Sequence, residues 1–144
     1  MTKVLVVEDE PDIRELLVDI LEDAGHEVVV AEDGVTALRE AHNHHPEIIL
    51  LDVMMPVMDG LEVLEHLKTD PVTRSITVIM VTAKGQSQDE IKARFAGAWD
   101  YITKPFEANE VETKVTAAGL LRRGAPPMKG PPVAAPFKRP PQNW

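Results

Sequence analysis

Residues 47–60 read EIILLDVMMPVMDG, and this stretch decides the fold class. Its first part is apolar without polar alternation, which is typical of a strand covered on both faces. The apolar run ends at Asp52, and the turn pair Asp59-Gly60 follows a few residues later. The stretch therefore predicts a buried strand over Glu47–Leu51 with an acidic residue directly after it.

Two other runs share this character, VLVV at residues 4–7 and VIMV at residues 78–81. Apolar residues recur at helical spacing between the runs, most clearly from Ile13 to Ala24 and more weakly elsewhere, as near Ile91–Ala98. Five strand–helix units predict an α/β fold, a doubly wound parallel sheet of five strands with five helices. The predicted strands are Lys3–Val7, Glu27–Ala31, Glu47–Leu51, Thr77–Val81 and Asp100–Thr103.

Charge and proline divide the 144-residue chain into two parts. Residues 1–121 hold all 24 acidic residues and ten of the 15 basic ones, a net charge of -14. Such a body disfavours nucleic acid and suits cationic partners or a divalent metal. The remaining five basic residues lie from Arg122 onward, and residues 124–144 hold seven of the twelve prolines. We expect a folded domain over residues 1–121 and an extended or disordered tail over residues 122–144.

Composition also excludes several classes of protein. The chain has no cysteine, which excludes disulfides, thiol catalysis and iron–sulfur clusters. No apolar stretch is long enough to cross a bilayer, and the N-terminus lacks the pattern of a signal peptide. A cytoplasmic protein is expected.

Polar residues follow four of the predicted strands. Glu8 and Asp9 follow the first, Asp52 the third, Thr82 the fourth and Lys104 the fifth. Carboxyl ends of parallel strands share one sheet edge, where open α/β proteins bind ligands, so these residues converge if their strands are neighbours. Clustered carboxylates favour a cation such as Mg²⁺, a lysine can contact a phosphoryl group, and an aspartate can accept one.

This combination resembles the receiver domain of response regulators in two-component signalling. The resemblance rests on Glu8-Asp9, on Asp52 within DVMMPVMDG, on Thr82-Ala83 and on Lys104-Pro105-Phe106, and it covers about residues 2–121. It implies a flavodoxin-like receiver fold with strand order 2-1-3-4-5. It also implies a single-domain switch that takes a phosphoryl group from a phosphohistidine. The donor would be a sensor kinase or phosphotransfer protein, and slow autodephosphorylation would accompany the switch rather than substrate turnover.

The resemblance also implies a role for each residue of the pattern. Asp52 would be the phosphoacceptor, and Thr82 and Tyr101 the switch pair. Mg²⁺, for which Mn²⁺ could substitute, would be held by Glu8, Asp9, Asp52 and the backbone carbonyl of Met54. The phosphoryl group would contact Thr82, Ala83 and Lys104.

Two further expectations concern the surroundings of the site. The Lys104–Pro105 peptide bond should be cis, because only X–Pro bonds adopt cis at low cost and tight turns use it. Met54 and Lys84 lie two residues past Asp52 and Thr82, where receivers admit the hydrolytic water, so we expect them to set the phosphoryl lifetime.

Three other functions compete with the switch. A Mg²⁺ phosphatase with an aspartyl nucleophile would resemble Asp-x-Asp, but Met54 stands at the second position. An FMN binder needs a glycine- and hydroxyl-rich loop after the first strand, where this chain has acids. A receiver-like module that is never phosphorylated would not need the acidic pocket.

Output is expected through a protein effector, without direct nucleic-acid binding or membrane insertion. The tail has three readings: an inert or tethering segment, a polyproline ligand, or a basic segment that folds back on the acidic body.

Overall fold

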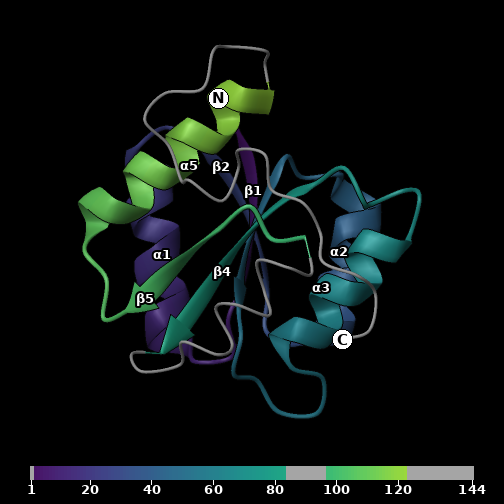
Figure 1. Ribbon diagram of the computed structural model, residues 1–144. Helices are drawn as coiled ribbons and strands as arrows, with labels where there is room; N and C mark the ends of the chain where they lie inside the picture. The colour runs from purple at the N-terminus through teal and green to yellow at the C-terminus, as the bar shows by residue number, and fades with distance from the viewer. Residues whose placement is uncertain (1, 84–96, 123–144) are drawn as a thin grey trace.

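The computed structural model describes residues 2–83 and 97–122. Strands and helices alternate over residues 3–83, and a further strand and helix follow over residues 100–122, which is the α/β pattern that the sequence predicted (Figure 1). Within the described residues, each short apolar run forms a strand, and four of the five runs with helical spacing form helices. The elements are β1 (Lys3–Val7), α1 (Pro11–Asp23), β2 (Glu27–Ala31), α2 (Gly34–His44), β3 (Ile48–Asp52), α3 (Gly60–Thr69), β4 (Thr77–Ala83), β5 (Asp100–Lys104) and α5 (Ala108–Arg122).

The strands form one parallel sheet in the order β2-β1-β3-β4-β5, which confirms the predicted order. Strand β1 pairs with β2 on one side and with β3 on the other, so it lies inside the sheet. The four strands that carry the polar residues of the predicted site, β1, β3, β4 and β5, are therefore consecutive neighbours.

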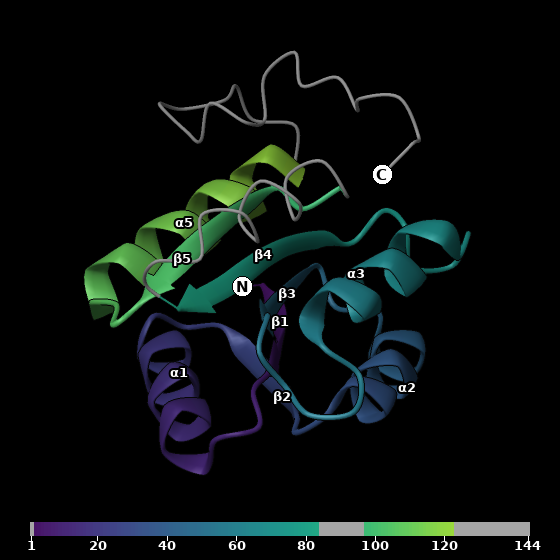
Figure 2. The same ribbon diagram turned by 60° about the horizontal axis from the view of Figure 1, so that its bottom comes forward.

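Both faces of the sheet are covered by helices. Helices α2 and α3 pack on one face, and α1 and α5 on the other, as Figures 1 and 2 show. The central strands bury every other side chain against each helix pair, so β3 supplies Ile49 and Leu51 to one layer and Ile48 and Leu50 to the other. This explains why the decisive stretch is apolar without alternation.

Three strands extend further than the sequence predicted. β3 ends at Asp52, β4 at Ala83 and β5 at Lys104, because backbone pairing continues between Asp52 and Val81 and between Ala83 and Lys104. These residues are thus held on the sheet itself and not on the loops beyond it.

Four of the five expected helices lie in the described residues. The helix expected near Ile91–Ala98 falls almost wholly outside them. Of that stretch only Gly97 and Ala98 are described, and Ala98 packs in the core on the α2 and α3 side. Among the described helices, none combines the length and the apolar character that crossing a bilayer requires.

Candidate functional site

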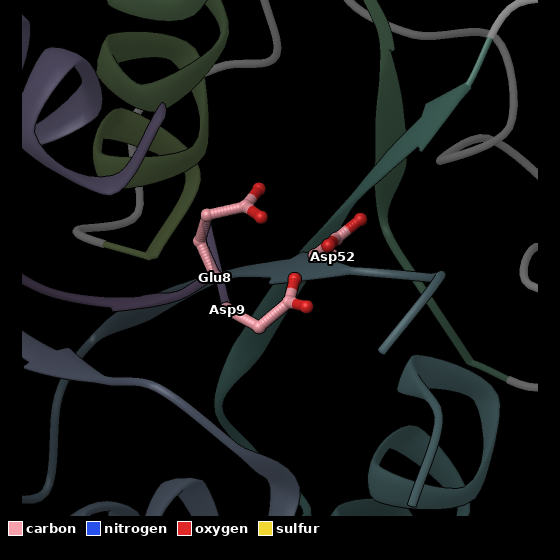
Figure 3. Close-up of side chains that lie close together, drawn as sticks. All are labelled: Glu8, Asp9 and Asp52. Atoms are coloured by element: carbon pink, nitrogen blue, oxygen red, sulfur yellow. The ribbon is translucent and has the colours of Figure 1, made fainter. Parts of the chain in front are cut away.

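Three carboxylates gather at the carboxyl edge of the sheet (Figure 3). Glu8 and Asp9 follow β1, and Asp52 ends the neighbouring strand β3. One oxygen atom from each side chain lies within 4.8 Å of the other two. Glu8 is 0% and Asp52 2% exposed, whereas Asp9 is half-buried. The topology therefore brings together the acidic residues that the sequence singled out.

Lys104 supplies the cation at this cluster. Its Nζ atom lies 3.0 Å from Oε1 of Glu8 and 3.4 Å from Oδ1 of Asp52. The backbone N–H of Met54 donates a further hydrogen bond to Oδ1 of Asp52, at 3.3 Å. The peptide bond between Lys104 and Pro105 is cis, as predicted. One ammonium group is thus the counter-ion of two buried carboxylates, and a third carboxylate lies close by.

This imbalance shifts the acid–base equilibria of the cluster. Burial, reinforced by the negative charge of Glu8, raises the pKa of Asp52 from its ordinary value of 3.8 to about 7. Lys104 and the Met54 N–H act in the opposite direction without offsetting the rise. Burial lowers the pKa of Lys104, but Glu8 and Asp52 together outweigh it and raise that pKa above 10.5. Lys104 therefore stays charged, while the Asp52 carboxylate carries an unfavourable charge at neutral pH.

Replacing Asp52 by Asn should consequently stabilise the fold. A carboxyl group whose pKa is higher in the folded state than in the unfolded state costs stability as the pH rises above its unfolded value. With metal chelated, we expect the free energy of unfolding of Asp52→Asn to exceed that of wild type by about 2 kcal/mol near pH 8. The gain should shrink toward pH 5, where native Asp52 is protonated. Urea denaturation at several pH values measures it, and a gain that grows on acidification would contradict the assignment.

A hard divalent cation fits this donor set. Like charges that share a buried site stay ionised together only if a cation enters, and the raised pKa of Asp52 shows that Lys104 alone is not enough. Carboxylate oxygens suit Mg²⁺ and also Mn²⁺. No second cluster of three or more His, Asp or Glu side chains with this spacing occurs among residues 2–83 and 97–122.

The predicted switch residues lie on the two strands next to β3. Thr82, in β4, is 0% exposed, and its Oγ1 atom has no hydrogen-bond partner in the described part of the chain. A buried hydroxyl without a hydrogen-bond partner destabilises the fold by about 1–3 kcal/mol. Such a destabilisation is expected where a bound ligand supplies the partner. Tyr101, in β5, is half-buried, and Nζ of Lys114 lies 5.3 Å from the centre of its ring.

Of the three remaining predicted residues, two are described by the structure and one is not. Ala83 is half-buried at the end of β4, and Met54 is 58% exposed just past Asp52. Lys84 lies outside the described residues.

Arg14 belongs to the site, although the sequence reasoning missed it. Its guanidinium group, on the first turns of α1, donates a hydrogen bond to the backbone carbonyl of Glu8 at 2.9 Å and approaches that of Asp9 at 3.5 Å. These contacts fix the acidic loop to the helix that follows it. The available signal was an arginine in the first turn of the predicted helix, five residues after Asp9.

Comparison with known proteins agrees with this geometry. The sequence profile described as "Response regulator receiver domain" matches residues 4–116, which is more than half of the chain. The chain belongs to this family.

Curated relatives of this receiver domain are longer proteins. It is 41% identical over 124 residues to the phosphate regulon transcriptional regulatory protein PhoB of Escherichia coli, covering 86% of this chain and 53% of PhoB. It is 42% identical to the DNA-binding dual master transcriptional regulator RpaA of Synechocystis, covering 85% of this chain and 50% of RpaA. The chain thus spans about half the length of these relatives.

Solved structures of similar length match this chain over almost their whole length. The receiver domain superposes on a putative response regulator from Chloroflexus aurantiacus with a TM-score of 0.78 at 32% identity, covering 81% of this chain and 96% of that one. For the Vibrio cholerae chemotaxis protein CheY4 the TM-score is 0.76 at 31% identity, with coverage of 81% and 97%.

Proposed function

We propose that this receiver domain is a cytoplasmic phosphorylation switch whose phosphoacceptor is Asp52. The donor is a phosphohistidine on a sensor histidine kinase or phosphotransfer protein, and a protein effector reads the result. One observation carries this proposal. Asp52 is a buried carboxylate at the sheet edge, with Lys104 3.4 Å away and the acidic pair beside it. These are the groups that phosphoryl transfer needs, because the reaction depends mainly on positioning and charge neutralisation.

Each side chain then has a distinct task. A carboxylate oxygen of Asp52 bonds to phosphorus while the phosphorus–nitrogen bond breaks, and the electron pair leaves with the imidazole. Lys104 offsets negative charge on the phosphoryl oxygens and also keeps part of Asp52 ionised near neutral pH, because it lowers the pKa of that carboxyl. Mg²⁺, held by Glu8, Asp9, Asp52 and the Met54 carbonyl, would supply further positive charge to the transferring group.

Thr82 and Tyr101 would convert phosphorylation into a change of surface. The unpaired, buried Oγ1 of Thr82 can donate a hydrogen bond to a phosphoryl oxygen on Asp52. Movement of Thr82 toward Asp52 would leave space into which Tyr101 turns, since β4 and β5 are paired neighbours. A population shift of a few kcal/mol between two arrangements of this face is sufficient. Ala83 would contact the phosphoryl group beside Thr82.

Chemical trapping at the acceptor tests this function. Borohydride reduces an aspartyl phosphate to homoserine, so treatment after incubation with a phosphohistidine donor should convert Asp52, and peptide mass spectrometry should locate the change. Conversion of a different carboxylate, with Asp52 left intact, would overturn the assignment. Lys104→Met serves as a matched variant, in which conversion should be slower at the same position.

Met54 should influence how long the phosphoryl group persists. Its side chain is exposed to solvent and follows Asp52 by two residues. We expect the decay of the phosphoprotein to change in Met54→Ala, and likewise in Lys84→Ala, as followed by loss of the phosphoryl mass over time. A decay equal to that of wild type in both variants would reject a role for these positions.

A further inference from the structure

A groove of about 620 Å³ lies beside the acidic site, on the side of α2 and α3. Its walls come from the loops after β1, β2 and β3, two of which, those after β2 and β3, lie side by side in Figure 2. Asp52 and Lys104 are not among its lining residues, so the groove adjoins the phosphorylation site without containing it. The residues that matter for its chemistry are Asp9, Glu32, Asp33, Val35, Val57 and Met58.

The apolar part of this groove is unusually open to solvent. Val35 is 59% and Val57 100% exposed. Val57 also has a backbone φ of 69°, in the left-handed region where a β-branched residue is a true outlier. Glycine or asparagine would adopt this conformation at lower cost. A fully exposed valine in a strained backbone conformation is typical of a functional position, so we expect the Val57 side chain to contact a binding partner.

The charged part of the groove is mostly acidic. Asp9, Glu32 and Asp33 face one cationic residue, Arg14. Asp33 begins α2, and its Oδ1 atom accepts a hydrogen bond from the Thr36 N–H at 2.8 Å. This bond lowers the pKa of Asp33, so the carboxylate stays ionised. A complementary occupant would combine apolar side chains with positive charges and carry no acids.

We propose that this occupant is residues 136–144 of the same chain, PFKRPPQNW. The segment offers Phe137 and Trp144 as apolar contacts and Lys138 and Arg139 as cations, and it contains no acidic residue. Its three prolines restrict the free chain, so less conformational entropy is lost when it binds.

The chain is long enough to reach the groove. Helix α5 ends near the amino ends of the strands, on the opposite side of the domain from the groove. This position follows from the hydrogen bond that the Arg122 guanidinium donates to the carbonyl of Ser75, just before β4 begins. A body of this size is roughly 35 Å across. The 13 residues that precede the segment, 123–135, span up to about 40 Å in a polyproline II conformation, which exceeds this width. The segment can therefore reach the far side of the domain and lie across Val35 and Val57.

Paramagnetic relaxation in the full chain tests this docking. Because the chain has no cysteine, Gln142→Cys provides a single attachment point for a spin label. We expect loss of amide signals for residues 32–35 and 57–58. A tail that does not bind would instead broaden signals near its attachment, at Ser75 and Arg122, and leave Val57 unchanged; that result would overturn the proposal.

Four further samples determine the origin of the effect. Reversing the tail charges with Lys138→Glu and Arg139→Glu should restore the signals. Val57→Ser should restore them too, whereas Val72→Ser, at an exposed valine outside the groove, should not. Spin-labelled chains mixed with isotope-labelled chains that lack the label should cause no loss. Loss of the same signals in that mixture would mean that a second copy is the occupant, which overturns the proposal.

Discussion

Replacing Lys104 by Met is expected to lower the free energy of unfolding by about 3 kcal/mol near pH 8 with metal chelated. Lys104 is the cation paired with Glu8 and Asp52, both almost fully buried. Methionine keeps most of the volume of the side chain and removes its charge, so two carboxylates would remain buried without a counter-ion. Urea denaturation followed by circular dichroism measures the loss.

The pH dependence of this loss provides a sharper test. Without Lys104, the pKa of Asp52 should rise above its value of about 7, because Lys104 is the main group that lowers it. The deficit should therefore shrink as the pH falls from 8 to 6, because Asp52 takes up a proton. Lys3→Met is a suitable control, since Lys3 forms a surface pair with Glu27 at 3.8 Å and such pairs contribute about 0–1 kcal/mol. A loss for Lys104→Met no larger than for Lys3→Met, or a loss independent of pH, would contradict this description of the site.

Gly60→Ala is expected to lower the free energy of unfolding by a similar amount, about 3 kcal/mol. A Cβ atom at Gly60 would lie 2.2 Å from the backbone carbonyl oxygen of Asp52 and 2.8 Å from Cα of Val53. Backbone atoms at the end of a central strand cannot move aside as a side chain can. The clash would also displace Asp52, so phosphorylation should fall together with stability.

Gly34→Ala is the matched control for this prediction. Both glycines are the first residue of a helix and follow an Asp that caps it. A Cβ atom at Gly34 would meet side-chain atoms, Sδ of Met58 and Cγ2 of Val63, each at 2.9 Å, and the methionine can shift. Thermal and urea denaturation should show a clearly smaller loss for Gly34→Ala. Equal losses at the two positions would mean that contact with the Asp52 backbone is not what requires Gly60.

Much of the fold could be predicted because the signals were local and consistent. The uninterrupted apolar runs indicated strands covered on both faces, and the helical spacing between them indicated crossovers. Strand ends were less accurate. Asp52, Thr82 and Lys104 are polar, which suggested that the strands had ended, yet each continues the backbone pairing of its neighbour.

The composition of the acidic cluster was predictable, but its energetics were not. Topology alone places Glu8, Asp9 and Asp52 at one edge of a parallel sheet. The raised pKa of Asp52 depends on how deeply it is buried and on how closely Glu8 and Lys104 approach, and neither quantity can be obtained from spacing in the sequence.

Backbone geometry accounts for the other features that the sequence reasoning missed. Asp59-Gly60 was recognisable as a turn, but only the packed structure shows that Gly60 touches the Asp52 carbonyl. The left-handed backbone at Val57 runs against the preference of a β-branched residue, so local propensity points away from it. The hydrogen bonds from Arg14 to the acidic loop likewise depend on where α1 begins.

The central claim is that Asp52 accepts a phosphoryl group with the help of a divalent cation. Intact mass spectrometry after incubation with acetyl phosphate tests it most directly, on wild type and Asp52→Asn, each with Mg²⁺ and with EDTA. We expect wild type to gain one phosphoryl group with Mg²⁺ and little with EDTA, and Asp52→Asn to gain none under either condition. The same Mg²⁺-dependent gain in Asp52→Asn, or no gain in folded wild type with Mg²⁺ present, would contradict the account.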